Sequence, residues 1–341
     1  MLRRLYEKNR SLTVRAALCS VVFSIGSTQA RAEDAPQNTH DNRIKIFADF
    51  QTSFALGDDV ETRAVNTTGG PSFVSSDILD TELDRIYGGT IGIVAPLDNF
   101  QQGAGPAWSL GITGRYDAGE TNENYGPVGT TFVMLPNSDS GTDVGVDATI
   151  EQKLGLGDLE LRYRADDSTS GLNNVVWKAG LRVGYHFENS TVSDASASAN
   201  PRTSVNKTEF LGVGPHIGTE FSMPVSDGVN IDFGIGGGLL FGQHERFRQV
   251  TFADGSSNAF GLPYLETQSE TRVIPTLDAV VALRTNMTEN VSLSIGVKLD
   301  YFFGIRDEFL SNNTDVVTPF SFDTDVDQYY FSPFVRLTSH F

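Results

Sequence analysis

The chain has 341 residues, a formal net charge of −18 and a single cysteine, Cys19. Such an acidic chain excludes nucleic acid as an expected partner, because the phosphate backbone would be repelled. Beyond the N-terminal segment, no apolar run reaches the roughly 20 residues that a membrane helix needs, which excludes a helical membrane protein. The length allows one large all-β domain or two ordinary domains.

Residues 1–32 have the pattern of a cleaved secretory signal peptide. A basic start precedes the apolar run Ala16–Ile25, which is too short to span a bilayer, and Ala30-Arg31-Ala32 matches an A-x-A cleavage site. The basic residues are Arg3, Arg4, Lys8, Arg10 and Arg15. Because Cys19 lies inside this segment, we expect a mature chain without disulfides, held together by hydrogen bonds and packing.

Alternating polarity recurs along the rest of the chain. In Val291–Phe303 the odd positions are apolar or aromatic, whereas the even positions from Ser292 to Asp300 are small or charged. A period of two predicts β-strands with one apolar face, and no segment shows a convincing period of 3.6 residues. The predicted strands are 43–56, 85–96, 107–117, 144–166, 174–188, 208–223, 229–242, 270–285, 291–306 and 326–341.

The polar faces and the connections distinguish a soluble β-sandwich from a membrane β-barrel. Acidic and basic residues are mixed on the polar faces, as expected where charged side chains point into a barrel lumen. The predicted connections alternate between long and short, as in outer-membrane barrels with long external loops and short periplasmic turns. We therefore predict an all-β, antiparallel transmembrane β-barrel of about ten strands, with eight or twelve as alternatives. It would occupy residues 43–341, after a short periplasmic segment at 33–42.

Three prolines conflict with this prediction. Pro215, Pro275 and Pro333 fall inside predicted strands, where a proline removes a hydrogen-bond donor from the ladder. We expect each of them at a bulge or another strand distortion.

Several segments resemble the Legionella-type pore-forming major outer membrane protein family. The run "FLGVGPHIGTEFSMPVSDGVNIDFGIGGGLLFG" (Phe210–Gly242) and the later "VIPTLDAVVALRTNMTENVSLSIGVKLDYFFG" carry the resemblance, with "GDLELRYR" and "KAGLRVGYHF" before them. It covers Val146–Phe303 and the terminal strand. His216 stands where this family commonly has arginine. The resemblance implies an outer-membrane barrel described as pore-forming, and it supplies no catalytic residues.

The last strand resembles the C-terminal strand of outer-membrane barrels, which ends on an aromatic residue preceded by alternate apolar residues. This resemblance implies recognition by the outer-membrane barrel assembly machinery, although Ser339 departs from the pattern. The residues of this expected assembly signal are Phe331, Val335, Leu337 and Phe341.

The sequence offers no recognised catalytic or cofactor-binding pattern. The five histidines have no H-x-x-x-H spacing, and there is no G-x-S-x-G motif. "GIGGG" at Gly234–Gly238 lacks the lysine and helix of a phosphate loop, so we interpret it as a strand that needs small residues toward the lumen. We expect a protein that is not an enzyme and has no cofactor and no metal.

Acidic residues crowd two of the predicted external loops. One interpretation is divalent-cation binding that bridges to lipopolysaccharide, and the other is an ordinary solvated surface, which the absence of D-x-D-x-D-G spacing favours. The first loop has Asp58, Asp59, Glu61, Asp77, Asp80, Glu82 and Asp84, and the second has Asp307, Glu308, Asp315, Asp323, Asp325 and Asp327.

Charged residues on the predicted inner faces are the candidate pore lining. A pore with this lining would select ions by charge and constriction, whereas in a filled barrel the same residues would pair with one another. The candidates are Arg115, Asp117, Glu160, Arg162, Arg164, Lys178, Arg182, Asp232, Asp278, Lys298 and Asp300. We predict a passive pore for ions or small solutes.

The alternative is a non-conducting structural or adhesive barrel that acts through its acidic external loops. In either case the expected partners are outer-membrane lipid and lipopolysaccharide, and an oligomer is possible.

Overall fold

The structure is a computed structural model, and it describes the strands together with the turns next to them. The described residues are 43–57, 63–66, 76–78, 85–97, 107–125, 131–135, 138–139, 146–164, 175–194, 202–252, 264–308 and 324–341. Among them, no helix is long and apolar enough to cross a membrane. The expected signal peptide and the segment 33–42 lie outside the described residues.

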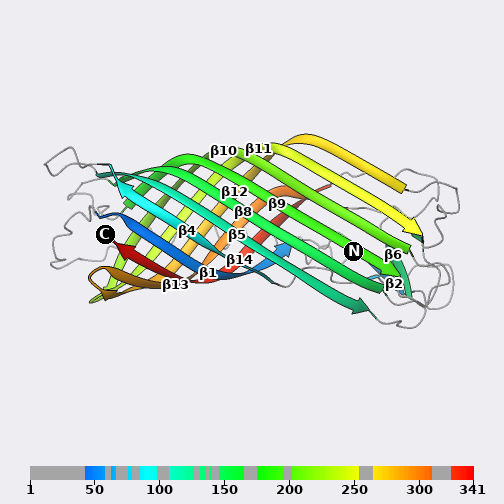
Figure 1. Ribbon diagram of the computed structural model, residues 1–341, viewed down its shortest axis with the longest axis horizontal. Helices are drawn as coiled ribbons and strands as arrows, with labels where there is room; N and C mark the ends of the chain where they lie inside the picture. The colour runs from blue at the N-terminus through cyan, green and yellow to red at the C-terminus, as the bar shows by residue number, and fades with distance from the viewer. Residues whose placement is uncertain are drawn as a thin grey trace. The chain divides into compact units, whose positions relative to one another are not determined.

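Ten strands form a closed antiparallel barrel, as the alternation predicted (Figure 1). Strands that follow one another along the barrel are neighbours, and β1 closes the barrel by pairing with both β4 and β14. The barrel strands are β1 (Lys45–Gly57), β4 (Ile86–Pro96), β5 (Ala107–Tyr125), β8 (Val146–Arg164), β9 (Val175–Asp194), β10 (Arg202–Ser226), β11 (Val229–Phe252), β12 (Tyr264–Thr288), β13 (Val291–Glu308) and β14 (Thr324–His340).

The first and last strands meet through the terminal phenylalanine. The amide of Phe341 donates to the carbonyl of Ile44 at 2.9 Å, and the amide of Ile44 donates back to the carbonyl of Phe341 at 3.0 Å. This mutual pair ends the β1–β14 ladder. The last residue of the chain therefore takes part in closing the barrel.

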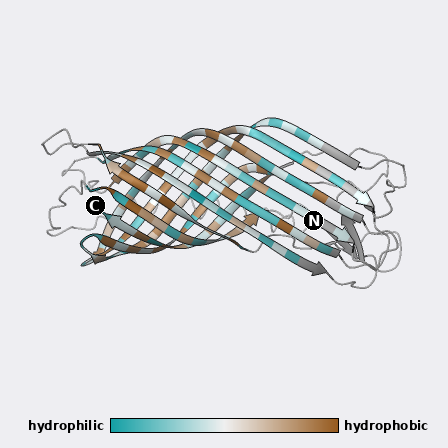
Figure 2. Ribbon diagram, in the orientation of Figure 1, coloured by the Kyte–Doolittle hydropathy of each residue, from teal (hydrophilic) through white to brown (hydrophobic). Residues whose placement is uncertain are grey.

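The lipid-facing belt is formed by alternate large apolar side chains, and Figure 2 shows their colours alternating with polar positions along the strands. Every barrel strand contributes to it, which is the arrangement expected where lipid replaces water around a barrel. Exposed members, one from each strand, are Phe50, Ile91, Ile112, Leu161, Leu181, Ile217, Phe241, Val281, Ile295 and Val335.

Two tight turns mark what we call the short-turn end of the barrel. One turn follows Ser226, where Gly228 has a φ of 73° that favours glycine, and the other joins Thr288 to Val291. The opposite end, the long-connection end, joins β1 to β4, β5 to β8, β9 to β10, β11 to β12 and β13 to β14. Short turns and long connections therefore alternate along the barrel strands, as the sequence predicted.

Strand lengths differ from the prediction on one side of the barrel. β10 and β12 have 25 residues each and β11 has 24, whereas β1 has 13 and β4 has 11. A tilted strand crosses the hydrocarbon core with about 9–11 residues, so β10–β12 continue well past the lipid-facing belt. The predicted long loop 189–207 is consequently mostly strand, and the β9–β10 connection is reduced to 195–201.

The three prolines interrupt strand pairing without shifting the register. The β10–β11 pairing stops at Val213 and resumes at His216 in the same register, which leaves out Pro215. The β12–β13 pairing begins just after Pro275, and the β1–β14 pairing skips Pro333. Of the two expected alternatives, a bulge or another strand distortion, the structure shows the second: register shifts lie elsewhere, and the missing donor is accommodated by a local gap in the ladder.

Four short strands form a second sheet within segments that were predicted to be loops. They are β2 (Arg63–Asn66), β3 (Ser76–Ile78), β6 (Thr131–Leu135) and β7 (Ser138–Asp139), in the order β3-β2-β6-β7.

Candidate functional site in the barrel interior

Charged side chains from strands that are not neighbours meet inside the barrel. Arg115 on β5 forms an ion pair with Asp300 on β13, and Arg182 on β9 contacts Asp278 on β12 at 2.7 Å. In a closed barrel, such contacts can only be made across the interior. The inner faces therefore carry the charged side chains, as the sequence predicted.

One group of ion pairs, which we call the first network, consists of three carboxylates and three cations. Lys298 Nζ donates to Asp49 at 3.0 Å and to Gln51 and Thr90 at 2.7 Å, and Arg336 contacts Asp49 at 2.7 Å. The six charged members are Asp49, Arg115, Asp117, Lys298, Asp300 and Arg336.

Arg115 is the centre of the first network. Besides Asp300, it contacts Asp117 at 2.7 Å and donates to the hydroxyls of Ser53 at 3.1 Å and Ser332 at 3.0 Å. The side chain of Arg115 is only 5% exposed and that of Asp117 is fully buried. Counted as ions, the three basic and the three acidic side chains of this network carry equal and opposite charges.

A second network lies across strands β8, β9, β10 and β12. Arg182 contacts Asp158 and Asp278, each at 2.7 Å, and Lys178 lies 3.4 Å from Glu160 and 3.2 Å from Glu220. Its members are Asp158, Glu160, Arg162, Lys178, Arg182, His216, Glu220 and Asp278.

Glycines on β11 make room for the second network. A Cβ atom at Gly236 would lie 2.7 Å from both His216 Nε2 and Asp278 Oδ2, which is closer than real Cβ contacts. At Gly238 it would lie 2.5 Å from the carbonyl oxygen of Pro215. The glycine run "GIGGG" thus serves close packing of inward side chains, in agreement with its interpretation as a strand that needs small residues.

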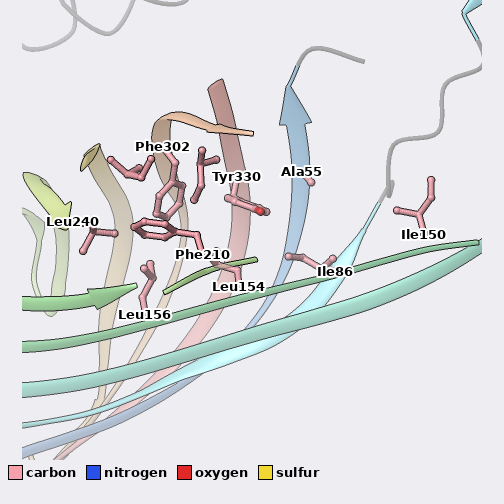
Figure 3. Close-up of a cluster of buried hydrophobic side chains, with 11 residues drawn as sticks. Ala55, Ile86, Ile150, Leu154, Leu156, Phe210, Leu240, Phe302 and Tyr330 are labelled. Atoms are coloured by element: carbon pink, nitrogen blue, oxygen red, sulfur yellow. The ribbon is translucent and has the colours of Figure 1, made fainter. Parts of the chain in front are cut away.

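An apolar layer lies between the networks and the long-connection end. Figure 3 shows its side chains converging from strands around the barrel, with Phe210, Phe302 and Tyr330 close together. Phe302 and Tyr330 pack edge to face, with ring centroids 6.0 Å apart. The members, all buried, are Ala55, Ile86, Ile150, Leu154, Leu156, Phe210, Leu240, Ile274, Phe302, Ile305 and Tyr330.

Water reaches the interior from the short-turn end. The inward side chains of Glu220 and Asp232 are 35% and 33% exposed, and Arg284, which lies 3.1 Å from Asp232, is 28% exposed. Along the same strands toward the long-connection end, Leu240 and Ile274 are 1% exposed. Solvent therefore reaches inward side chains near the short-turn end, whereas the inward side chains of the apolar layer are buried.

The predicted pore-lining residues lie in the first network, in the second network and near the short-turn end. Asp232 pairs with Arg284 near the short turns, and Arg164 ends β8 opposite Val176 and Ala107. The other nine belong to the two networks: Arg115, Asp117, Lys298 and Asp300 to the first, and Glu160, Arg162, Lys178, Arg182 and Asp278 to the second. Their role in a pore remains a prediction.

Several interior residues are absent from the predicted pore lining. Asp49, His216 and Glu220 were on recognised polar faces, so the alternation alone could have found them. The apolar layer had a subtler sign: Phe210 and Leu240 are large apolar residues at positions of the inward parity. An apolar residue out of phase at one end of a barrel strand indicates a lumen that is closed there.

Most of the acidic residues in the predicted external loops lie outside the described side chains. Asp327 is an exception, and protein groups occupy its carboxylate: the amide of Gly304 donates to Oδ1 at 3.0 Å, and the hydroxyl of Tyr301 donates to Oδ2. In the described part of the chain, no three His, Cys, Asp or Glu side chains gather as metal ligands. Cation binding by the loops stays a hypothesis.

The expected assembly signal lies on the outer surface of β14. Phe331, Val335 and Leu337 are 41–49% exposed on the lipid-facing side, and Phe341 is 71% exposed. Their recognition by the assembly machinery remains a prediction.

Comparison with protein families identifies the barrel. A family model described as Legionella pneumophila major outer membrane protein precursor matches residues 107–327, which is more than half of the chain. The chain belongs to this family. It is accordingly an outer-membrane β-barrel protein, and the resemblance noted in the sequence is confirmed. Among curated proteins, none matches the chain.

Several solved outer-membrane barrels are similar to this protein in fold only, at low sequence identity. The outer membrane protease OmpT from Escherichia coli is 11% identical with a TM-score of 0.42, over 89% of this chain and 98% of the protease. The Pseudomonas putida toluene transporter TodX is 10% identical with a TM-score of 0.36, over 90% of both chains. The translocator domain of the autotransporter NalP from Neisseria meningitidis is 11% identical with a TM-score of 0.36, over 97% and 98%.

Proposed function

We propose that this protein is a narrow outer-membrane pore for ions or small solutes that is closed in the described conformation. The observation that carries the proposal is the charged interior, where two networks of opposite charges meet across the lumen. Charged side chains at membrane depth are costly, and in membrane proteins they often line ion or substrate pathways. Buried ion pairs are weak evidence for stability, since apolar packing can replace them without loss. A pore explains why this interior is charged.

The apolar layer acts as the gate of the proposed pore. A constriction lined by apolar side chains excludes water and ions without a physical plug. Phe210, Leu240 and Ile274 are fully buried in this layer, whereas charged groups nearer the short-turn end are reached by water. Conduction therefore requires displacement of apolar side chains, and we expect brief openings of small conductance.

Neighbouring leucines on β11 provide a matched test. Leu240 points into the apolar layer and is 1% exposed, whereas Leu239 faces lipid and is 41% exposed. Leu240→Ala removes the same atoms as Leu239→Ala but thins the gate, because alternate residues face opposite sides. We expect single-channel recordings of the refolded chain without residues 1–32 to show openings that become severalfold more frequent in Leu240→Ala and do not change in Leu239→Ala.

A salt gradient in the same recordings gives the sign of ion selectivity. Equal behaviour of the two leucine variants would contradict a gate in the apolar layer. Absence of openings from all folded, heat-modifiable barrels would contradict the pore itself.

A second candidate function is a non-conducting barrel that presents its outer rim to partners. The observation that favours it is the extension of β10–β12 beyond the lipid-facing belt, together with interior cations such as Arg115 and Arg182 that already contact carboxylates. Absence of channel openings from folded, heat-modifiable barrels would favour this candidate. Neither candidate function is enzymatic, consistent with a sequence that has no recognised catalytic motif.

A further inference from the structure

We propose that His216 is a proton-binding site that holds the lumen closed when it is protonated. The inference rests on the proposed pore function for its effect on conduction. It rests on the geometry of the second network for the proton site itself. His216 is 1% exposed and projects from β10 into the barrel interior.

Both ring nitrogens of His216 face carboxylates. Nε2 lies 2.8 Å from Asp278 Oδ1 on β12, and Nδ1 lies 3.4 Å from Glu160 Oε1 on β8. A neutral imidazole carries one N–H and can donate to one of these carboxylates only, while its other nitrogen presents a lone pair to the second. An imidazolium donates from both nitrogens. This environment therefore favours the charged form.

The strands around His216 bring three further cations and two further carboxylates. β8 contributes Arg162 in addition to Glu160, β9 contributes Lys178 and Arg182, and β10 itself contributes Glu220. Asp158 on β8 is held by Arg182. β11, which lies between β10 and β12, presents Gly236 and Gly238 to the ring.

The charges of this network balance only if His216 is protonated. Its carboxylates are Asp158, Glu160, Glu220 and Asp278, and its permanent cations are Arg162, Lys178 and Arg182. Four negative charges meet three positive ones, so a neutral imidazole leaves one negative charge in excess. The imidazolium cancels it. The first network, in contrast, is balanced without any histidine.

Because His216 is closely packed, an uncompensated negative charge beside it cannot be relieved by small movements of the ring. The ring lies against Gly236 and Gly238, where even a methyl group would collide with it or with its neighbours. A neutral ring that donates to Asp278 turns the lone pair of its other nitrogen toward Glu160, 3.4 Å away. Repulsion between this lone pair and the carboxylate favours separation of the His216 and Glu160 side chains. Water from the short-turn end, where Glu220 is 35% exposed, then enters the network. Loss of the proton thus loosens the lumen just below the apolar layer.

The expected behaviour is an open probability that rises with pH. Two substitutions fix the charge: His216→Arg keeps a positive charge at all working pH values, and His216→Gln keeps a hydrogen-bonding side chain without charge. Single-channel recordings of the chain without residues 1–32, from acidic to alkaline pH, should show severalfold more openings at alkaline pH. His216→Arg should stay mostly closed throughout, and His216→Gln should open at all pH values. His340→Gln, outside both networks, is the control and should keep the original pH profile.

A second readout does not depend on conduction. The temperature at which the folded barrel converts to the unfolded gel form should fall as pH rises in the unsubstituted protein. It should be lowered throughout in His216→Gln and should be independent of pH in His216→Arg.

The two readouts distinguish the failure of this inference from the failure of the pore. Openings whose pH profile is unchanged in His216→Gln and His216→Arg would overturn the proton site and leave the pore standing. No openings in any variant, together with a His216-dependent shift of the conversion temperature, would support the proton site and overturn the pore. A conversion temperature that follows pH equally in all variants would overturn the proton site.

Discussion

The two charged networks use the same side-chain chemistry in different ways. The first network cancels its charges with lysine, arginine and aspartate alone, and its central pair, Arg115 and Asp117, is almost completely buried. The second network has one carboxylate more than its permanent cations, and its Glu220 and Asp278 side chains are 35% and 21% exposed. The first is therefore suited to fixing the distance between strands. The second is suited to responding to its surroundings.

The difference follows from where each network lies around the barrel. The first joins the short strands β1 and β4 to β5, β13 and β14, where the barrel closes on itself. The second lies across β8, β9, β10 and β12, and the glycines of β11 allow its side chains to pack closely against the strand. Ion pairs that join the first and last strands must stay in place to keep the barrel closed. A site that regulates opening instead needs two arrangements of similar free energy.

The largest expected effect comes from breaking the first network at its centre. Arg115→Met removes the cation that faces Asp117 and Asp300 and leaves both carboxylates buried without it. Removing one partner of a buried pair costs about 3–5 kcal/mol. We expect a loss of this size in the free energy of unfolding, measured by urea titration of the folded barrel in lipid vesicles.

Arg284→Met is the control for this substitution. Arg284 faces a single carboxylate, Asp232, at the water-accessible end of the lumen, and both side chains are about one-third exposed. An exposed pair contributes roughly 0–1 kcal/mol. Equal losses in the two variants would show that the first network has no special structural role.

A smaller effect is expected from overpacking the second network. Gly236→Ala places a methyl group 2.7 Å from both His216 Nε2 and Asp278 Oδ2, so these two side chains must separate. Overpacking a close-packed interior costs about 1–3 kcal/mol. We expect that decrease in unfolding free energy, accompanied by more frequent openings in the planar bilayer, because the His216–Asp278 contact is lost.

The matched control is Gly114→Ala on β5. A Cβ atom there would meet no heavy atom within 4 Å, so the same chemical change is made in open space. Gly114→Ala should leave both stability and channel activity unchanged. If Gly236→Ala behaves in the same way, the glycines of β11 are not needed for the packing of His216.

The barrel could be predicted from the sequence because lipid and lumen impose opposite polarity on alternate residues. Val291–Phe303 shows that alternation clearly, and it forms β13 with the predicted faces. The alternation fails where both faces of a strand carry small polar side chains. In the continuation of β9 and β10, serine and threonine occupy inward and outward positions alike, as at Ser190 and Thr191, so the strands looked like a loop although their ladder continues.

The members of the interior were also predictable, but their partners were not. Arg115 and Lys298 were selected from the inward parity alone, and both lie inside the barrel. Their partners Asp300 and Asp49 come from strands far away in the sequence, brought together by barrel closure and strand tilt. Since neither tilt nor stagger is encoded in local alternation, the division into two networks and the charge imbalance around His216 required the structure.

The smallest effect is expected on the outer surface of the barrel, at an ion pair whose N–O distance matches that of the interior pairs but whose side chains are exposed. Lys207 and Glu209 are 2.7 Å apart on β10, but their side chains are 40% and 32% exposed. Lys207 also lies over the Phe187 ring, with its ammonium 5.2 Å from the ring centroid. Exposed ion pairs and exposed cation–π contacts each contribute about 1 kcal/mol or less. Lys207→Met should therefore lower the unfolding free energy by less than a third of the Arg115→Met effect, and added salt should reduce even this difference, because exposed charges are screened. A loss as large as that of Arg115→Met would show that distance, rather than burial, determines what an ion pair contributes in this barrel.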